Sequence, residues 1–224
     1  MARPWETIET VATREGPLEL RRRGETDFLI TIRGRILMTS AAHRSEDALA
    51  KLACADAAKR PKARVLIGGL GMGFTLRAAL DALRSDARVT VAELNPVVAN
   101  WCRGPLSPLT KHALSDPRTT LRVGDVATAI AEASKGTKPR RFDAIMIDLY
   151  EGPQSRIPEK HPLYGPIATE RAFDALERWG IYAIWCEQAS PAFERNLRSA
   201  GFELELVRAG HGASVHLIYV AKRA

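Results

Sequence analysis

Short apolar runs recur along the chain, and most are followed by a stretch with apolar residues at helical spacing. The runs fall at residues 65–67, 88–92, 119–123, 142–148 and 181–187. Runs of this length bounded by turn residues are typical of buried parallel strands, and the stretches between them of helices that cover a sheet. Two last runs, at 202–207 and 215–221, indicate an antiparallel pair. The pattern predicts an α/β fold with a mostly parallel sheet of seven strands, helices on both faces and a reversed C-terminal hairpin.

The first 40 residues have a different pattern. Apolar and polar residues alternate at 18–22, and β-type runs follow at 28–32 and 36–38. Alternation with a period of two is typical of strands with one buried face. Residues 1–40 are therefore predicted to form a small β hairpin or three-stranded meander, attached to an α/β domain of residues 41–224. Ser40 or Ser45 is expected to cap the helix that follows.

The same pattern predicts where the loop, helix and strand between residues 149 and 187 begin and end. A helix is predicted over 168–179, before the fifth strand at 181–187, and residues 149–166 form a long loop. The length of this loop and its Gly and Pro content lead to the hypothesis that it is a lid. Trp101, Trp179 and Trp185 lie in helix or strand patterns and are expected in the core.

A glycine-rich turn follows the first central strand, formed by Gly68, Gly69, Gly71 and Gly73. Glycines let backbone N–H groups approach a ligand closely. The second strand ends in Glu93, where an acid can accept hydrogen bonds from a ribose diol. The order of strand, glycine turn, helix, strand and acid favours a nucleoside-binding half-fold over a purely structural turn.

Two more strand ends carry acids, Asp125 after the third strand and Asp148 after the fourth. Ligands of parallel sheets bind outside the carboxyl ends of the strands, so these acids and Glu93 are expected at one edge. NAD is disfavoured, because a dinucleotide pattern begun at Gly69 puts Phe74 where its third glycine belongs.

Composition narrows the classes of partner. The 224 residues carry a formal charge of +7, yet the basic residues are spread out apart from Arg21–Arg23 and the stretch 138–141. Without a stripe of basic residues interleaved with aromatic ones, nucleic-acid binding is not expected.

The chain has three scattered cysteines, which argues against a metal site and for a cytoplasmic protein. No apolar run is long enough to predict a membrane span, and the first residues lack the apolar core of a signal peptide. Free edges of the N-terminal sheet leave room for a homodimer.

Four motifs resemble the spermidine-synthase-like group of S-adenosylmethionine-fold proteins. They are Val-Leu-Ile-Gly-Gly-Leu-Gly-Met-Gly at 65–73, Val-Ala-Glu-Leu-Asn-Pro at 91–96, Asp-Pro-Arg with Val-Gly-Asp between 116 and 125, and Phe-Asp-Ala-Ile-Met-Ile-Asp-Leu-Tyr-Glu-Gly-Pro at 142–153. The resemblance spans most of the chain. It implies a class I methyltransferase-like Rossmann sheet, and S-adenosylmethionine or its decarboxylated form as cofactor.

The resemblance also implies roles for residues at the strand ends. Glu93, followed by Leu94, would hold the ribose hydroxyls. Asp125, followed by Val126, would accept the adenine amino group. Asp148 would sit beside the sulfonium and the attacking group, and it would also contact the cofactor. Tyr150 and Glu151, on the loop that follows, are the other catalytic candidates. Glu151 stands where the family has a second acid.

The chain departs from the family at the glycine turn. Aminopropyltransferases carry an Asp there, and this chain has Gly71, while Leu37 and Ser-Glu-Asp at 45–47 replace the family's Gln and Tyr-His-Glu. A missing carboxylate would no longer repel the carboxylate of intact S-adenosylmethionine. We therefore predict methyl transfer to a small-molecule acceptor, such as an amine. The alternatives are aminopropyl transfer from decarboxylated S-adenosylmethionine, and a non-catalytic nucleoside-binding module.

Either transfer requires removal of a proton from the acceptor. Asp148 and Glu151 are the predicted bases, because two nearby carboxylates in a cleft raise the pKa of one of them. His161 is expected to be exposed to solvent.

Overall fold

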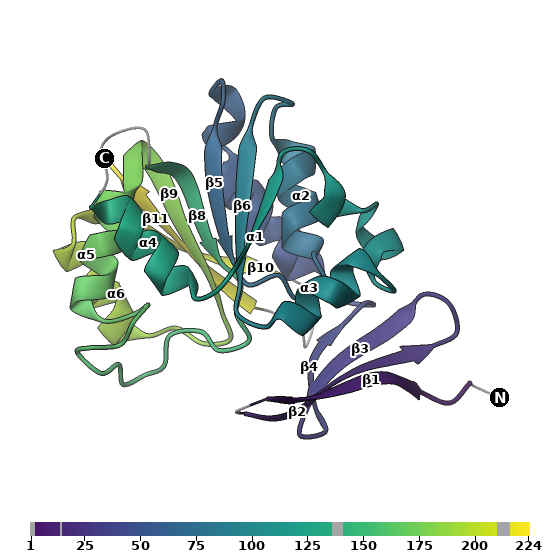
Figure 1. Cartoon of the computed structure of the whole chain (residues 1–224). Helices are drawn as coiled ribbons and strands as arrows, with labels where there is room; N and C mark the ends of the chain where they lie inside the picture. Colours follow the sequence, from purple (N-terminus) through teal and green to yellow (C-terminus); the bar gives the residue numbers. More distant parts are fainter. Residues whose placement is uncertain (1–2, 14, 136–140, 210–215) are drawn as a thin grey trace.

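The computed structural model describes residues 3–13, 15–135, 141–209 and 216–224. The connection between the last two predicted strands, around 210–212, and most of the basic stretch at 138–141 lie outside these residues. The chain forms a seven-stranded sheet with helices on both faces and a separate four-stranded sheet at the N-terminus (Figure 1). This arrangement confirms the predicted α/β class.

The large sheet has the strand order β10-β11-β9-β8-β5-β6-β7. Only β11 runs against its neighbours, since it pairs antiparallel with both β9 and β10, so the predicted reversed hairpin is confirmed. The strands are β5 (Arg64–Gly68), β6 (Arg88–Glu93), β7 (Thr119–Val123), β8 (Phe142–Ile147), β9 (Leu176–Cys186), β10 (Phe202–Ala209) and β11 (His216–Arg223).

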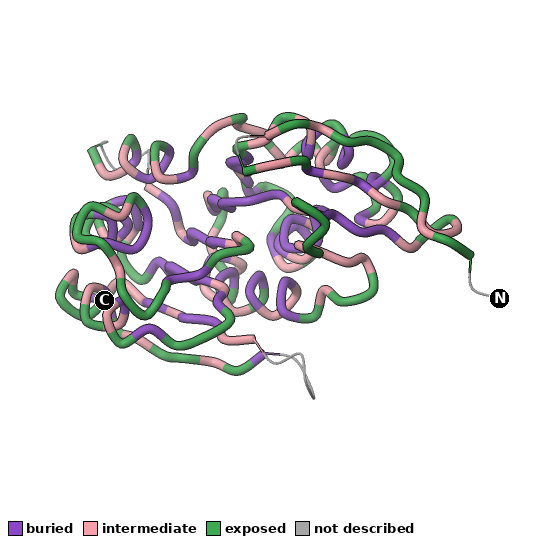
Figure 2. Tube along the Cα trace, turned by 90° about the horizontal axis from the view of Figure 1, so that it is seen from below, coloured by how far each residue is buried: buried purple, intermediate pink, exposed green. Residues whose placement is uncertain are grey.

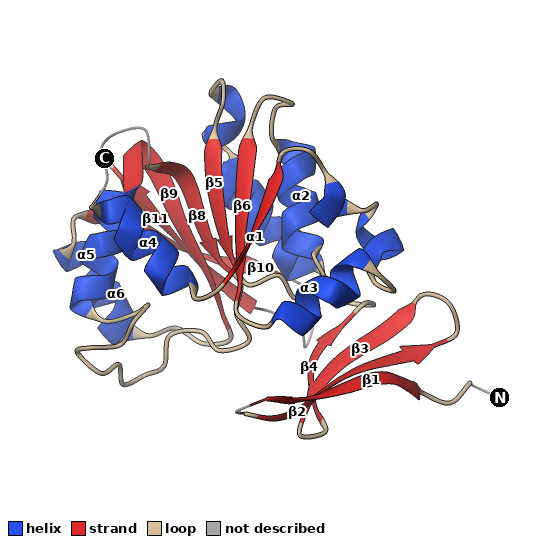
Figure 3. Ribbon diagram, viewed as in Figure 1, coloured by secondary structure: helices blue, strands red, loops and turns tan. Residues whose placement is uncertain are grey.

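Helices cover both faces of this sheet (Figure 3). One face carries α1 (Arg44–Cys54), α2 (Phe74–Ala82) and α3 (Pro96–Arg103), and the other carries α4 (Val126–Ser134), α5 (Pro166–Ala175) and α6 (Pro191–Ser199). Short 3-10 helices lie at Ala57–Lys59, Ser107–Thr110 and Ala113–Ser115. No helix in the described part of the chain is long and apolar enough to span a membrane.

The central strands are buried on both faces, which is why they appear in the sequence as continuous apolar runs. Val65 and Ile67 pack into the cluster under α1 and α2, and Leu66 between them packs into the cluster under α4. Buried segments gather inside the layers of helices, and the outer turns are exposed (Figure 2). Side chains therefore alternate between two cores, one on each side of the sheet.

The small sheet has four strands, one more than the predicted meander. These are β1 (Glu6–Thr13), β2 (Gly16–Arg23), β3 (Asp27–Ile32) and β4 (Arg35–Thr39), paired in sequence order. The prediction missed β1 because the strand is mostly exposed and carries no apolar alternation. Leu18, Leu20 and Phe28 join the core of the larger domain, and Trp101 Nε1 donates to Glu9 at 2.7 Å. The division at residue 40 remains a prediction.

Two boundaries differ from prediction near β9. The helix ends at Ala175, and β9 begins at Leu176 rather than 181. The pairing with β8 slips between Phe142 and Ala144, and Trp179 has a φ of 65°, so residues 177–180 bulge out. Trp179 is 44% exposed, and the prediction that it lies in the core is wrong. Its ring lies against Arg178 instead.

The cap of α1 is also not the predicted one. The residue at the cap position is His43, and it makes no side-chain capping bond. Ser40 Oγ accepts from the Phe28 N–H in the small sheet, and Ser45 Oγ donates to the Glu46 carboxylate at 2.6 Å. Both hydroxyls are therefore engaged elsewhere.

Candidate active site

The glycine turn brings three segments into contact at the carboxyl end of β5. Gly69, Gly71 and Gly73 all have positive φ, at 92°, 53° and 88°. A Cβ on Gly69 would clash with the carbonyl oxygen of Asp148, and one on Gly68 would clash with Val126 of α4. Because only hydrogen fits at these positions, the ends of β5 and β8 meet directly.

Glu93 lies against this turn at the end of β6. The residue is 7% exposed, and its carboxylate accepts from the N–H groups of Leu70 at 2.9 Å and Asn95 at 2.8 Å. Burial raises the pKa of Glu93, and these backbone N–H groups oppose the increase. The next residue, Leu94, is 63% exposed, so an apolar side chain faces solvent beside a fixed carboxylate.

Asp125 caps α4 after β7. Its Oδ1 accepts from the Ala127 N–H at 2.8 Å. The residue is exposed, and among the described residues its Oδ2 accepts no hydrogen bond. Val126 is buried beneath Gly68 and fixes the start of α4 against the turn. Asp125 can thus serve the helix with one oxygen and a ligand with the other.

Asp148 follows β8, and its carboxylate accepts from Thr75 Oγ1 at 2.5 Å. The pKa of Asp148 is raised from 3.8 to about 7, first by burial and then by the negative charge of Glu46, while the Thr75 bond opposes the increase. Glu46 is itself only 8% exposed on α1. The site thus contains two interacting carboxylates, one on α1 and one directly after β8.

Glu46 is the residue that the sequence analysis missed as a partner of Asp148. We paired Asp148 with Glu151, but Glu151 is exposed, and the carboxylate that raises the pKa of Asp148 is Glu46. A signal was present in the sequence. Glu46 falls three, four and seven positions before the buried residues Leu49, Ala50 and Ala53, so it is an acid on an apolar helix face.

In Glu46→Gln, we expect Asp148 to titrate at a lower pH than about 7, because one of the two causes of its raised pKa is removed. Carboxyl-carbon NMR titration measures this directly. The matched control is Asp47→Asn, which removes the same charge from the same helical turn but from a carboxylate that faces His43. An unchanged Asp148 titration in Glu46→Gln would contradict the pairing.

The same shift has a consequence for stability. The folded chain holds the Asp148 proton more tightly than the unfolded chain, whose ordinary pKa is 3.8. The stability contributed by this carboxyl is therefore complete below that pH and is lost as the pH rises toward about 7.

The loop after Asp148 is fixed at both ends. The Tyr150 hydroxyl donates to the Glu15 carboxylate of the small sheet, which raises the pKa of Tyr150 to about 12. Tyr164 is buried and donates to the Glu151 carbonyl at 3.0 Å. His161 is stacked on Tyr164 and half-buried, so the prediction that it is exposed is wrong. Tyr150 therefore joins the loop to the N-terminal sheet.

Breaking this contact should loosen the loop. In Tyr150→Phe we expect trypsin to cleave several-fold faster after Arg156 and Lys160, which are exposed in the loop. Glu15→Ala should have the same effect, because it removes the acceptor. Glu25→Ala, an exposed glutamate elsewhere in the small sheet, is the control. Equal rates in all four proteins would show that the contact does not hold the loop.

Met38 of β4 covers the glycine turn from the small sheet. A Cβ on Gly71 would clash with the Met38 sulfur. The Met38 side chain is flexible, so this contact alone does not require glycine at position 71. The φ of 53° at Gly71 lies in the left-handed region, which favours glycine and also admits Asp or Asn.

In the described part of the chain, no group of three or more His, Cys, Asp or Glu side chains is placed to bind a metal ion. The predicted site residues fall into two groups. Glu93, Asp148 and the glycines lie together at the carboxyl edge of the sheet, and Asp125 joins them through Val126. Tyr150 and Glu151 lie on the exposed loop beyond Asp148.

Comparison with known proteins finds curated relatives that are all polyamine aminopropyltransferases. The chain is 27% identical over 130 residues to a polyamine aminopropyltransferase of Sulfurisphaera tokodaii, covering 58% of this chain and 39% of the relative. Over 85 residues it is 33% identical to that of Sulfolobus acidocaldarius, covering 38% and 26%. Over 108 residues it is 33% identical to that of Corynebacterium efficiens, covering 48% and 19%. The matches thus span about two fifths or less of these relatives. No family model matches.

Two solved structures share the fold over almost the whole chain. A spermidine synthase in complex with the transition-state analogue AdoDATO has a TM-score of 0.73 at 17% identity, covering 97% of this chain and 72% of that one. The spermidine synthase from Thermotoga maritima has a TM-score of 0.74 at 19% identity, covering 97% and 73%.

These relatives overturn the prediction of methyl transfer and favour its alternative, aminopropyl transfer. The prediction depended on the missing carboxylate at Gly71. Similarity in sequence to polyamine aminopropyltransferases and in fold to spermidine synthases together confirm the resemblance of this chain to the spermidine-synthase-like group.

Proposed function

We propose that the chain transfers an aminopropyl group from decarboxylated S-adenosylmethionine to a small amine. The observation that carries the proposal is the carboxylate of Asp148, placed beside the glycine turn with its pKa raised to about 7. A base with a pKa near neutrality suits proton removal at physiological pH. The names of the curated relatives support the same group transfer.

The residues at the strand ends fit such a donor. Glu93 is fixed by backbone N–H groups and keeps lone pairs for the ribose hydroxyls. The unengaged oxygen of Asp125 suits the adenine amino group, and Leu94 offers an exposed apolar surface to the base. The glycine turn allows the donor to approach the backbone closely. The donor supplies an aminopropyl carbon activated by a sulfonium.

Proton transfer is assigned to Asp148. The acceptor nitrogen forms a bond to the carbon attached to sulfur, sulfur leaves with the bonding pair as a neutral thioether, and Asp148 takes the amine proton. Glu46, at the same site, adds negative charge that attracts a cationic amine to this edge. Tyr150 and Glu151 are proposed to face the acceptor from the loop, with the loop acting as a lid.

We also propose a domain boundary, a cellular location and an oligomeric state. The boundary near residue 40 separates a β appendage from the donor-binding domain. A cytoplasmic location fits Cys54, Cys102 and Cys186, which are buried free thiols. Pairing of two copies through an edge of the small sheet would give a homodimer.

An assay of products tests the proposed function. The chain is incubated with a panel of diamines and either decarboxylated or intact S-adenosylmethionine, and the products are identified by mass spectrometry. We expect methylthioadenosine and an amine that has gained one aminopropyl group, only with the decarboxylated donor. Calorimetric binding of the donor without any product would favour the non-catalytic module. Binding of neither donor would remove the nucleoside assignment.

A further inference from the structure

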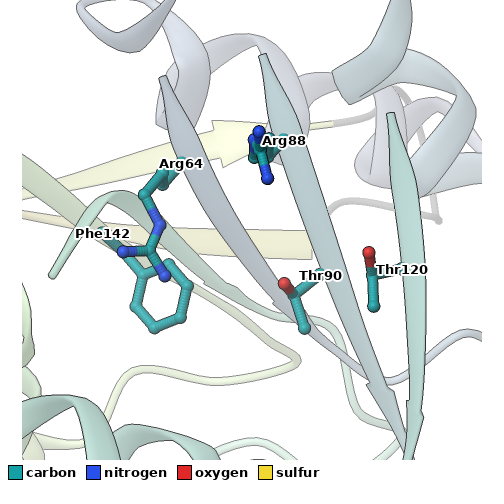
Figure 4. Close-up of a pocket in the computed structure, with 5 residues that line it drawn as sticks. All are labelled: Arg64, Arg88, Thr90, Thr120 and Phe142. Atoms are coloured by element: carbon teal, nitrogen blue, oxygen red, sulfur yellow. The ribbon is translucent and has the colours of Figure 1, made fainter. Parts of the chain in front are cut away.

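A pocket lies at the end of the sheet opposite the candidate active site, where the strands begin. It has a volume of about 370 Å³ and is lined by Arg64, Arg88, Thr90, Thr120 and Phe142 (Figure 4). Arg64 and Arg88 are the first residues of β5 and β6, and Phe142 is the first of β8. Glu93 and Asp148, in contrast, stand at or just after the ends of their strands. The pocket is therefore separate from the candidate active site.

Two arginines at paired strand positions line this pocket, and neither guanidinium group has an ion-pair partner among the described residues. Arg64 and Arg88 are directly paired across β5 and β6. Neither side chain makes an ion pair or hydrogen bond with any residue that the structure describes. Two like charges at paired positions repel each other, and a bound anion would offset this repulsion.

Two arginines on neighbouring segments are neutralised. Arg60 pairs with Asp143 at 2.6 Å and Arg122 with Glu132 at 2.6 Å. Arg64 and Arg88 thus differ from these two arginines in having no carboxylate partner among the described residues.

The rest of the lining suits an oxyanion. The Arg64 guanidinium lies over the Phe142 ring at 5.4 Å, which orients its plane and leaves its N–H edge available. Thr90 and Thr120 are paired across β6 and β7, and within the described residues their hydroxyls make no hydrogen bond. Figure 4 shows these two hydroxyls on adjacent strands of the same side of the sheet as the arginines.

We propose that this pocket binds a compact oxyanion of the phosphate class, either free phosphate or the phosphate group of a small metabolite. The guanidinium groups of Arg64 and Arg88 supply charge and paired donors, and the threonine hydroxyls supply further donors. The volume is at the lower end of the range for small-ligand pockets, so it accommodates a phosphate with a small attached group.

Calorimetric titration of the full chain with inorganic phosphate tests the proposal, at constant ionic strength set with sodium chloride. We expect saturable one-site binding that is weakened about tenfold or more in Arg88→Gln, because a charged hydrogen-bonding partner is removed. Arg88 is exposed at the start of its strand, so the variant keeps the fold. Thr120→Val should weaken binding to a smaller degree. A small phosphomonoester in place of phosphate distinguishes the two sources of the anion, since the attached group adds affinity only if the pocket is built for a metabolite.

The matched control is Arg103→Gln, an exposed arginine of α3 without a partner among the described residues. It should bind phosphate as the unmodified chain does, and aminopropyl transfer should be unchanged in Arg88→Gln. The absence of saturable binding would overturn the proposal. An equal loss in Arg103→Gln would overturn it as well, by showing that net charge alone attracts the anion.

Discussion

Asp148→Asn is expected to lower the turnover number by about 10²- to 10⁴-fold while donor affinity changes only a few-fold. An asparagine cannot take up the acceptor proton, and its side chain is nearly the same size. Its amide oxygen still accepts the hydrogen bond from Thr75 Oγ1, so the local structure is retained. Single-turnover kinetics and calorimetry of donor binding separate the two effects.

The control for this variant is Asp143→Asn on the same strand. Asp143 lies at the opposite end of β8 and binds Arg60 Nη1 and the Arg64 N–H. We expect this variant to lower the free energy of unfolding and leave the turnover number unchanged. If Asp148→Asn retained full turnover, Asp148 would not be the base. If it lost donor binding in proportion to turnover, Asp148 would be a donor ligand alone.

Glu93→Gln is expected to weaken donor binding by about 10- to 100-fold, with a turnover number at saturation close to that of the unmodified chain. A carboxylate accepts strong hydrogen bonds from ribose hydroxyls, whereas an amide offers a single neutral oxygen. The amide nitrogen would also face one of the N–H groups of Leu70 or Asn95. The free energy of unfolding should therefore fall by about 1–3 kcal/mol.

Loss of stability and loss of binding are separated by a second variant. Asp116→Asn breaks a hydrogen-bonded ion pair with Arg118, at 2.8 Å and largely shielded from solvent. Arg118 also donates to the Leu80 carbonyl near the C-terminal end of α2, the end away from the glycine turn. The variant should destabilise the chain to a similar degree without a change in donor affinity. Thermal unfolding and calorimetry of both variants make the comparison. Equal donor affinity in Glu93→Gln and Asp116→Asn would mean that Glu93 only braces the glycine turn.

The parts of the fold predicted correctly from sequence depend on local patterns. The run from β5 through the glycine turn and α2 to Glu93 is contiguous, so its strand, turn and helix signals follow one another. The reversed hairpin at the C-terminus is equally local. In each case the residues that determine the structure are neighbours in the chain, and their periodicity reports burial directly.

The features that were missed depend on contacts between distant segments. Tyr150 and its acceptor Glu15 are 135 positions apart. Glu46 of α1 acts on Asp148 after β8, and Met38 of β4 contacts the glycine turn at Gly71. Neither periodicity nor composition encodes such pairings. The wrong prediction of methyl transfer arose from inferring the transferred group from a single residue, Gly71.

A structure of the chain bound to decarboxylated S-adenosylmethionine tests the central claim, that the donor lies across the carboxyl edge of the sheet. We expect the ribose hydroxyls within about 2.6–3.2 Å of the Glu93 carboxylate and the aminopropyl carbon directed toward Asp148. A donor bound elsewhere, or with its ribose away from Glu93 and its sulfur remote from Asp148, would contradict the account.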